Sequence, residues 1–331
     1  MRQIYGIDLS KEKFDVNFID QTSQEQHSVV KNDLKNISRF LDSIPMDSHL
    51  VAEHTGVYGD LLLFLSNQMN IRISLCSGYS IKHSLGLRKG KTDKIDAARI
   101  REYGERFYDT LKETKVNSEL MNELRELYSL RNHLVKERKM LQTKQKGVMR
   151  LAIRSIYAKE VYTRIVSQLT KEIRDIERQL LEIIHSDEEF SRNFDLVTSI
   201  KGIGPITTCE LMIKTSNFKR IATAKRAASY AGICPFPNAS GQMVKKSRIS
   251  PMSDKSLKSL LFMCAKSAVA HNKEYRLYYQ KKQLEGKPHY LIMTNVANKL
   301  IRTVYKIIES GCPWDSNYIC YDPREENKKV A

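Results

Sequence analysis

Four acidic residues are the part of this sequence best suited to chemistry. Asp8 and Glu53 each end an apolar, strand-like run, in YGID and HLVAE, and Asp93 and Asp96 stand three residues apart at a predicted helix start in KTDKIDAAR. Carboxylate oxygens are the hard ligands that Mg²⁺ or Mn²⁺ prefers. Two such ions about 4 Å apart can activate a nucleophile and stabilise the leaving oxygen of a phosphodiester. The four acids therefore predict a divalent metal site that acts on phosphodiesters.

Each of these acids also has a purely structural explanation when it is taken alone. Asp8 would form a turn after a strand, and Glu53 would be a solvated charge at a strand end. Asp93 would be a helix N-cap, with Asp96 at the N3 position. His54, beside Glu53, is better explained as a bystander than as a metal ligand. Taken together, four acids at element ends favour the metal site.

The charge of the whole chain points to a polyanionic partner. The 331 residues carry a formal net charge of +17. Neutralising phosphates with lysine and arginine releases counterions, which gives affinity without sequence preference. A basic solvated surface and an acidic protein partner are the alternatives. Bare carboxylates would repel a phosphate, so a nucleic-acid substrate requires the metal.

The acids must be positioned by an α/β domain, predicted over residues 1–111. Strand patterns cover Gln3–Leu9, Phe14–Ile19, Gln26–Lys31, His49–Glu53 and Ile71–Cys76, and helical patterns cover Leu34–Ser43 and Asp60–Met69. The early strands follow each other closely and the helices come later. This order predicts a mixed sheet with helices on its faces.

Residues 112–190 have a different pattern, in which leucine and isoleucine recur every three or four residues between charged side chains, with Arg131 interrupting. The pattern predicts two long helices in a coiled-coil hairpin, or one helix broken near Gly147–Tyr157. The apolar face formed by these residues would mediate dimerisation, or it would be buried between two helices of the same chain.

Residues 191–315 are predicted to form a compact helical domain, followed by a polar tail over 316–331. The stretch SIKGIGP resembles the turn of a helix-hairpin-helix, in which Lys201, Gly202 and Gly204 would contact a phosphate. A plain glycine turn between packed helices is the alternative. Further helices are expected at Ile206–Ile213, Thr223–Ala231, Lys255–His271, Lys273–Leu284 and Tyr290–Ser310.

A serine in this domain is a possible nucleophile. Ser240 lies in the Pro/Gly/Asn-rich stretch AGICPFPNASG, which is predicted to be a loop, and Lys245, Lys246 and Arg248 follow it. Cations of this kind stabilise the charge that develops when a hydroxyl attacks a phosphodiester. Taken alone, Ser-Gly in a loop is a turn. A second basic cluster, Arg88–Lys94, contributes Lys91 and Lys94 as further candidate contacts to nucleic acid.

Several of these segments together resemble the DEDD transposases of insertion sequences. YGIDLSKEKFDV, EHTGVYG and KTDKIDAARI resemble the N-terminal domain of that family, and AGICPFPNASG…KKSRIS resembles its C-terminal transposase domain. The family is related to Piv-type DNA invertases and includes bridge-RNA-guided recombinases. The resemblance spans nearly the whole chain. In the helix-hairpin-helix turn, Lys201 replaces a proline that is usual in the family.

The resemblance implies more than the residues do. It implies an RNase H-like, RuvC-like N-terminal fold in which Asp8, Glu53, Asp93 and Asp96 hold Mg²⁺. It implies that Ser240 attacks DNA and forms a covalent phosphoserine link. It also implies a non-coding bridge RNA that selects donor and target DNA, dimers that pair into a tetramer, and an active site shared between subunits. A RuvC-like structure-selective nuclease, with Ser240 a bystander, and a non-catalytic nucleic-acid-binding protein are the alternatives.

The remaining features concern the cellular setting. No run of about 18 apolar residues occurs, and the N-terminus leads directly into a strand pattern, so neither a membrane span nor a signal peptide is expected. The six cysteines form no C-x-x-C pair, which favours free thiols over a zinc site. The expected location is the cytoplasm, with nucleoid association when the protein is active.

Overall fold

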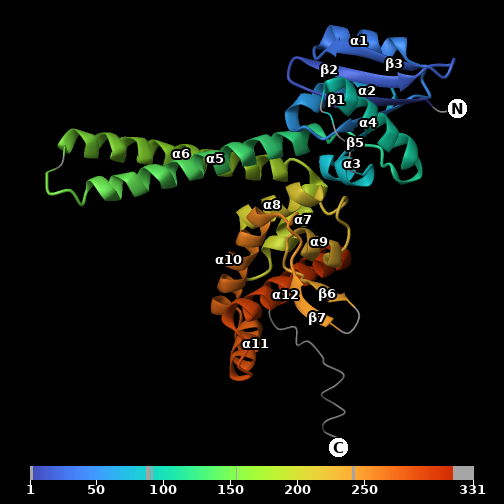
Figure 1. Cartoon of the computed structure of the whole chain (residues 1–331). Coiled ribbons are helices and arrows are strands. Elements are labelled where there is room, and N and C mark those ends of the chain that lie inside the picture. The colour runs from blue at the N-terminus through green and yellow to red at the C-terminus, as the bar shows by residue number, and fades with distance from the viewer. Residues whose placement is uncertain (1–2, 87–89, 91, 154, 241–242, 316–331) are drawn as a thin grey trace, which may run out of the picture. The chain divides into compact units, whose positions relative to one another are not determined.

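A computed structural model describes residues 3–86, 90, 92–153, 155–240 and 243–315 (Figure 1). For residues 237–240 and 243–248 it describes the backbone alone. The chain divides between Asn117 and Ser118 into two compact units, and each unit has its own hydrophobic core. They are called the N-terminal domain and the C-terminal domain below.

The N-terminal domain is built on a five-stranded mixed sheet with the order β3-β2-β1-β4-β5. Its β1–β2 and β2–β3 pairs are antiparallel, whereas β4 runs parallel to both β1 and β5. The strands are β1 (Ile4–Leu9), β2 (Lys13–Ile19), β3 (Glu25–Lys31), β4 (His49–Glu53) and β5 (Arg72–Cys76). The predicted mixed sheet and its strands are therefore confirmed.

Helices cover both faces of this sheet. α1 (Leu34–Ser43) and α2 (Asp60–Gln68) pack on one face, where Tyr5, Ile7 and Phe14 are buried in the main core of the domain. α4 (Asp93–Arg106) packs on the other face against β1, β2 and β4. Because side chains alternate along a strand, the even-numbered residues of β1 face α4. Two short 3₁₀ turns (Gly56–Gly59 and Tyr108–Thr110) and α3 (Gly78–Ser84), a helix that the sequence did not predict, complete the domain.

Close packing between α4 and the sheet depends on Gly6. A Cβ atom at this position would collide with backbone atoms of Ala97 and Arg101 in α4. The absence of a side chain lets α4 lie directly on β1, which brings the start of this helix to the sheet.

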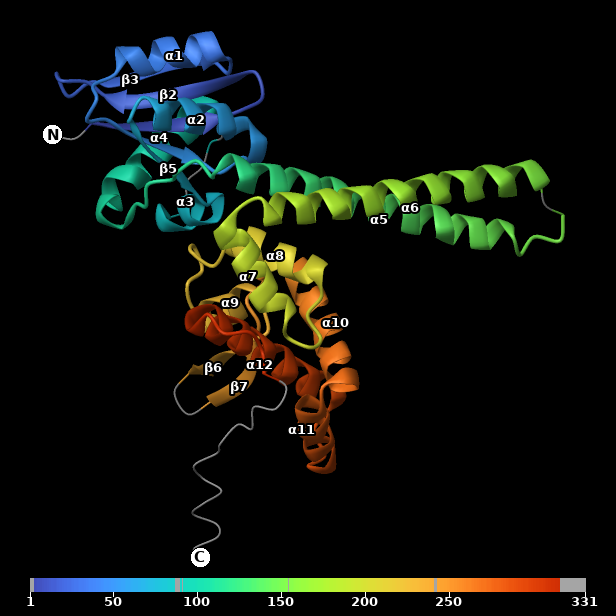
Figure 2. The same cartoon turned by 180° about the vertical axis from the view of Figure 1, so that it is seen from behind.

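The C-terminal domain begins with two long helices, α5 (Glu119–Val148) and α6 (Ile156–His185), which pack along each other as an antiparallel hairpin (Figure 2). Three polar contacts join them at intervals of seven residues: Arg131–Glu177, Arg138–Thr170 and Gln145–Thr163. Arg131, which interrupts the apolar pattern, thus lies 2.7 Å from the Glu177 carboxylate. The two long helices are confirmed, whereas a coiled coil and dimerisation through it stay predictions.

The rest of this domain is a helical bundle around α12 (His289–Ser310), whose Val296, Leu300 and Val304 are fully buried. The other helices are α7 (Glu188–Thr198), α8 (Pro205–Thr215), α9 (Ala224–Tyr230), α10 (Lys255–His271) and α11 (Lys273–Leu284). The predicted helices of this region are present, and α7 begins before the predicted start of the domain. No helix within the described residues has the length and apolar character needed to cross a membrane.

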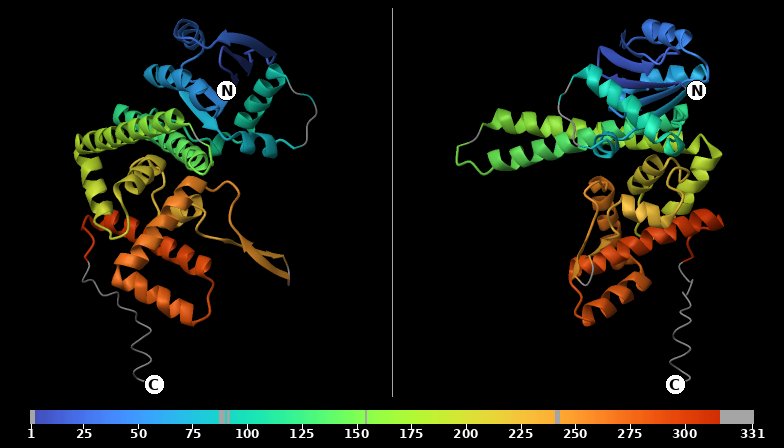
Figure 3. Two further views of the ribbon diagram at one scale, coloured as in Figure 1. Left: turned by 90° about the vertical axis from the view of Figure 1, so that its left-hand side faces the viewer. Right: turned by 45° about the vertical axis from the view of Figure 1, so that its right-hand side comes forward.

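The segment around Ser240 differs from its prediction as a loop. β6 (Phe236–Ser240) and β7 (Met243–Arg248) pair in an antiparallel two-stranded ribbon, which projects from the helices in Figure 3 (left panel). Ser240 is the last residue of β6, paired with Met243. Pro237 and Asn238, which favoured a loop, thus lie in a strand, and the register shifts between Phe236 and Asn238.

Candidate active site

The sheet brings Asp8 and Glu53 to one edge and one face. β1 and β4 are parallel neighbours whose last registered pair is Ile7 with Ala52, so Asp8 and Glu53 follow side by side. Ile7 and Ala52 both belong to the core on the opposite face. Alternation along the two strands therefore turns Asp8 and Glu53 together towards the α4 face.

α4 adds the other two acids to this region. Thr92 caps the helix: its Oγ1 accepts a hydrogen bond from the backbone N–H of Ile95 at 3.3 Å. Asp93 and Asp96 follow in the first turn. The alternative explanation of Asp93 as the helix N-cap is therefore wrong. Because the Thr92 hydroxyl caps the helix, the Asp93 carboxylate is available for other partners.

Three of the acids act electrostatically on the fourth, Asp8. The pKa of Asp8 is raised to about 6, first by burial and then by the negative charges of Asp96, Asp93 and Glu53, with a further contribution from Asp15. Burial disfavours the charged carboxylate, and nearby carboxylates disfavour it further. The fold thus concentrates negative charge at this edge of the sheet, within a chain of net charge +17.

The carboxylates do not, however, converge on a single point. Among the described residues, no group of three or more His, Cys, Asp or Glu side chains has an arrangement that would hold a metal ion. Charges act over many ångströms, whereas Mg²⁺ requires oxygens about 2.1 Å away. The other three carboxylates are thus close enough to act on Asp8, and the oxygens of all four are of the type that binds a hard divalent cation, but these oxygens do not point to a common position.

Two of the four carboxylates, those of Asp93 and Asp96, point to cationic side chains. Asp93 Oδ2 lies 3.1 Å from Lys13 Nζ, and Asp96 Oδ1 lies 3.0 Å from Arg99 Nη1. Glu53 instead lies against Gly78 at the start of α3. Convergence on a metal would require Asp93 and Asp96 to exchange these partners.

A fifth acid, Asp15, belongs to the same face and was not singled out from the sequence. It is directly opposite Asp8 in the β1–β2 register and only 4% exposed. Its Oδ1 lies 2.8 Å from His27 Nε2, and its Oδ2 lies 3.1 Å from Lys13 Nζ. The alternation of Lys13 and Asp15 with the apolar Phe14 and Val16 is the signal that could have identified it.

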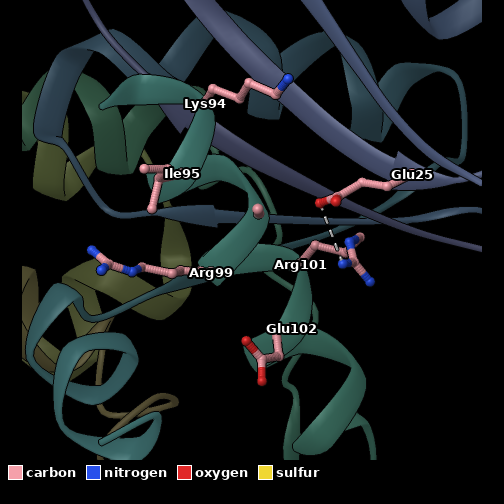
Figure 4. A pocket seen from close by; sticks show the side chains of 7 residues that line it. Glu25, Lys94, Ile95, Arg99, Arg101 and Glu102 are labelled. Atoms are coloured by element: carbon pink, nitrogen blue, oxygen red, sulfur yellow. Dashed lines mark ion pairs between the residues drawn. The ribbon is translucent and has the colours of Figure 1, made fainter. Parts of the chain in front are cut away.

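A pocket of about 380 Å³ lies along the exposed side of α4 (Figure 4). Lys94 lines it, so this predicted contact to nucleic acid lies one residue from Asp93 and beside a concave surface. Arg101 lines the same pocket, paired with Glu25 at 3.7 Å. Glu25 also lines the pocket, and the remaining lining residues are Ile95, Ala98, Arg99 and Glu102. Lys91 lies outside the described residues.

The predicted phosphate contacts of the C-terminal domain lie between α7 and α8. Gly202 has a φ of +112°, and a Cβ there would lie 2.8–2.9 Å from Ala268 of α10, so close packing explains this glycine. Gly204 precedes Pro205 as the N-cap of α8, with open space around it, and Lys201 is exposed. The helix-hairpin-helix assignment stays a prediction. The side chains of Ser240, Lys245, Lys246 and Arg248 lie outside the described part of the structure.

Comparison with known proteins relates both domains to transposases. Residues 5–153 match a family model described as a transposase, of the DEDD type of IS110 elements. Residues 194–280 match the model described as the transposase IS116/IS110/IS902 family. The four acids fall within the first match and Ser240 falls within the second.

Individual relatives agree with the family models. The pilin gene-inverting protein of Moraxella bovis is 26% identical over 324 residues, which cover 94% of this chain and 97% of that protein. An uncharacterised 44.8 kDa protein of the insertion element IS116 from Streptomyces clavuligerus is 25% identical over 140 residues, covering 42% of this chain and 34% of that protein. The transposase of IS1328 from Yersinia enterocolitica is 28% identical over 151 residues, covering 43% and 42%.

Proposed function

Because this chain belongs to the IS110/IS116 family of DEDD transposases, we propose that it is the recombinase of an insertion sequence, which cuts and rejoins DNA. The relative in Moraxella bovis is named for inverting a pilin gene. The match to it extends along almost the whole of both chains, which supports a DNA rearrangement by this chain as well. The proposed substrates are a donor DNA and a target DNA.

The observation that carries this proposal is the gathering of the acids on the α4 face. The pKa of Asp8 is raised to about 6, first by burial and then by the negative charges of Asp96, Asp93 and Glu53, so these three acids lie close enough to act on it. A fold that only needed capping residues would not concentrate charges that repel one another. We propose that these four side chains hold Mg²⁺ or Mn²⁺. The bound ion would supply Lewis-acid stabilisation of the charge that develops on the phosphate.

Ser240 is the proposed nucleophile. Its Oγ would attack the phosphorus of the scissile phosphodiester, and the bond from phosphorus to the leaving strand oxygen would break. The leaving strand keeps the electron pair and takes up a proton, and the other strand end stays attached as a phosphoserine ester. A hydroxyl of the recombination partner then attacks this ester and releases the serine, so the phosphodiester bond count is conserved.

Basic residues support the nucleic-acid partners. Lys91 and Lys94 beside the acids, Lys201 with Gly202 and Gly204, and the cluster of Lys245, Lys246 and Arg248 after Ser240 are the proposed contacts. Family resemblance supports a bridge RNA that pairs with donor and target DNA, in which case base pairing rather than protein side chains would select the sequence.

Family resemblance also supports an active site shared between subunits. In this proposal, the acids of one subunit act with Ser240 of another, and dimers pair into a tetramer. Mixing a subunit that lacks Ser240 with one that lacks Asp8 tests this arrangement, because each mixed pair has one shared site in which both the acids and the serine are intact. Two inactive variants that stay inactive when mixed would argue for a site within one subunit.

The chemical step is tested by covalent capture. Wild-type protein, Ser240→Ala and Asp8→Asn are incubated with DNA carrying the element ends, Mg²⁺ and co-purified RNA, and protein–DNA adducts are resolved under denaturing conditions. Both variants should lose the adduct, and Ser240→Ala should bind DNA and metal normally. An adduct formed by Ser240→Ala would refute the nucleophile, whereas metal-dependent cleavage without any adduct would indicate the nuclease activity instead.

Sequencing the co-purified RNA tests the guide. A discrete RNA encoded by the element would support guided recombination. A random sample of cellular RNA would leave only the electrostatic attraction expected from the net charge.

A further inference from the structure

Lys13 connects the sheet to α4 within the acidic site. It is the first residue of β2, and its ammonium nitrogen lies 3.1 Å from Asp15 Oδ2 and 3.1 Å from Asp93 Oδ2. The two acids are 78 residues apart in the chain. One side chain therefore bridges a carboxylate of the sheet and a proposed metal ligand of α4.

The two ends of this bridge differ in how firmly they are held. The Asp15 side chain is 6% exposed, and its second oxygen is occupied by His27 at 2.8 Å. The Asp93 side chain is 62% exposed, and of its two oxygens Oδ2 contacts Lys13. Breaking a contact of a buried carboxylate that has two partners is costly, whereas an exposed ion pair contributes little to stability. The contact with Asp15 is therefore the anchor, and the contact with Asp93 is the one that can exchange.

Lys13 also lies where positive charge is needed. Asp8, Asp15, Asp93, Asp96 and Glu53 share one face of a small domain, and the charges of the other four all act on Asp8. The Lys13 ammonium lies 3.1 Å from a carboxylate oxygen of Asp15 and of Asp93, and so places one positive charge between the sheet and α4. An ammonium offers one charge and three hydrogen-bond donors, but no Lewis-acid site.

We propose that Lys13 is a positioning residue that neutralises the acidic site in the absence of metal and gives up Asp93 when a divalent cation binds. This inference rests on the proposed metal-dependent function. Metal binding would then be an exchange of one cation for another at Asp93. The exchange would set how tightly the protein holds the metal and would protect the metal-free fold from repulsion between carboxylates.

The test measures Mn²⁺ binding to the full chain without DNA, by following the electron paramagnetic resonance signal of free Mn²⁺. Lys13→Met should bind Mn²⁺ roughly two- to five-fold more tightly than wild type, the size expected for removing one competing exposed ion pair. Lys13→Arg keeps the charge and should bind as wild type does. Lys31→Met is the matched control, because Lys31 is directly opposite Lys13 on β3, is exposed and makes no ion pair within the described residues.

Two further measurements isolate the contact with Asp93. The gain from Lys13→Met should disappear in an Asp93→Asn background, because the exchangeable carboxylate is absent. In chelator, Lys13→Met should unfold at a lower temperature than Lys31→Met, and added Mn²⁺ should narrow that difference. This thermal readout also verifies that the variant is folded.

The outcomes separate this inference from the proposed function. Metal binding by wild type with an unchanged or weaker affinity in Lys13→Met would overturn the role of Lys13 alone. An equal gain in Lys31→Met would also overturn it, because the effect would then be general electrostatics. If the wild type does not bind Mn²⁺, the proposed metal-dependent function is refuted, and the proposed exchange of cations at Asp93 is refuted as well.

Discussion

The carboxylate of Glu53 occupies the space that a side chain at Gly78 would need. An added Cβ at Gly78, the first residue of α3, would collide with Oε1 and the carboxyl carbon of Glu53. The glycine is thus required by a proposed metal ligand that lies 25 residues earlier in the chain. This relationship gives a way to move Glu53 without mutating it.

Gly78→Ala is expected to move the Glu53 carboxylate and to weaken metal-dependent DNA cleavage, with a smaller loss than Glu53→Gln, because the flexible side chain can shift and keep its carboxylate. Alanine is the better helix former, so the loss would come from displacement of Glu53 and not from a weaker helix. Cleavage assays with both variants measure this. Gly147→Ala is the control, because Gly147 lies in α5 with nothing within 4 Å of its added Cβ. Wild-type cleavage by Gly78→Ala would exclude a role for Glu53 at its present position.

The raised pKa of Asp8 predicts a pH-dependent stability of the metal-free protein. The folded state binds the Asp8 proton more tightly than the unfolded state does, with a pKa of about 6 against an ordinary 3.8. The stability that this group contributes is therefore complete below pH 3.8 and is lost as the pH rises through 6. Asp8→Asn should be more stable than wild type at pH 7, by about 1–2 kcal/mol after allowance for solvent screening.

Urea unfolding in chelator between pH 4 and pH 7 measures this difference. The advantage of Asp8→Asn should grow with pH across that interval and then level off. A difference that is constant with pH would show that neither burial nor the neighbouring carboxylates raise the pKa of Asp8 in the folded protein.

Gly6→Ala should separate α4 from the sheet and displace Asp93 and Asp96. The added methyl group meets the backbone of α4, which cannot rotate away, so a loss of about 1–3 kcal/mol in unfolding free energy is expected, together with weaker Mn²⁺ binding. Gly104→Ala lies on the same helix but meets side-chain atoms of Val51 and Ile4, which can repack. Denaturant unfolding should therefore show a smaller loss for Gly104→Ala. Equal losses would contradict the explanation based on backbone contact.

Tyr128→Phe should destabilise the C-terminal domain at the base of its helical hairpin. The Tyr128 hydroxyl in α5 donates to the carboxylate of Glu210 in α8, which is 1% exposed. Burial, followed by Glu210, raises the pKa of Tyr128 and keeps it a donor. Removing the hydroxyl leaves a buried carboxylate without this donor, at a cost of about 2–3 kcal/mol.

Substitution of Glu210, the partner of Tyr128, provides the control for this contact. If Tyr128 acts through Glu210, combining Tyr128→Phe with Glu210→Gln should cost less than the sum of the two single losses in thermal or denaturant unfolding. Additive losses would show that the two residues act independently.

Secondary structure was largely predictable from local pattern. The strands of the N-terminal sheet and the long helices α5, α6, α10 and α12 follow from apolar spacing, because one buried face imposes a period of two or about 3.6 residues. α3 was missed because seven residues give too short a pattern. The hairpin around Ser240 was missed because Pro237, Asn238 and Gly241 are typical of loops.

The sequence by itself determined which residue types were available for chemistry: four acids at element ends, a basic chain, and a serine within a recognisable motif. The number and spacing of the acids indicated a metal site, and the resemblance of the motifs to a known family indicated the class of protein, because motif residues are local features. The placement of each acid followed only from the register of β1 with β4 and from the approach of α4 at Gly6.

The tertiary structure alone decided the partners of these acids. Lys13 with Asp93, Asp15 opposite Asp8 and Glu53 against Gly78 are contacts between elements that no local period encodes. Whether a carboxylate faces a cation, another carboxylate or a glycine depends on which strands pair and which helix covers them. These contacts are set by the packing of the whole domain, and for that reason they could not be read from the residues one segment at a time.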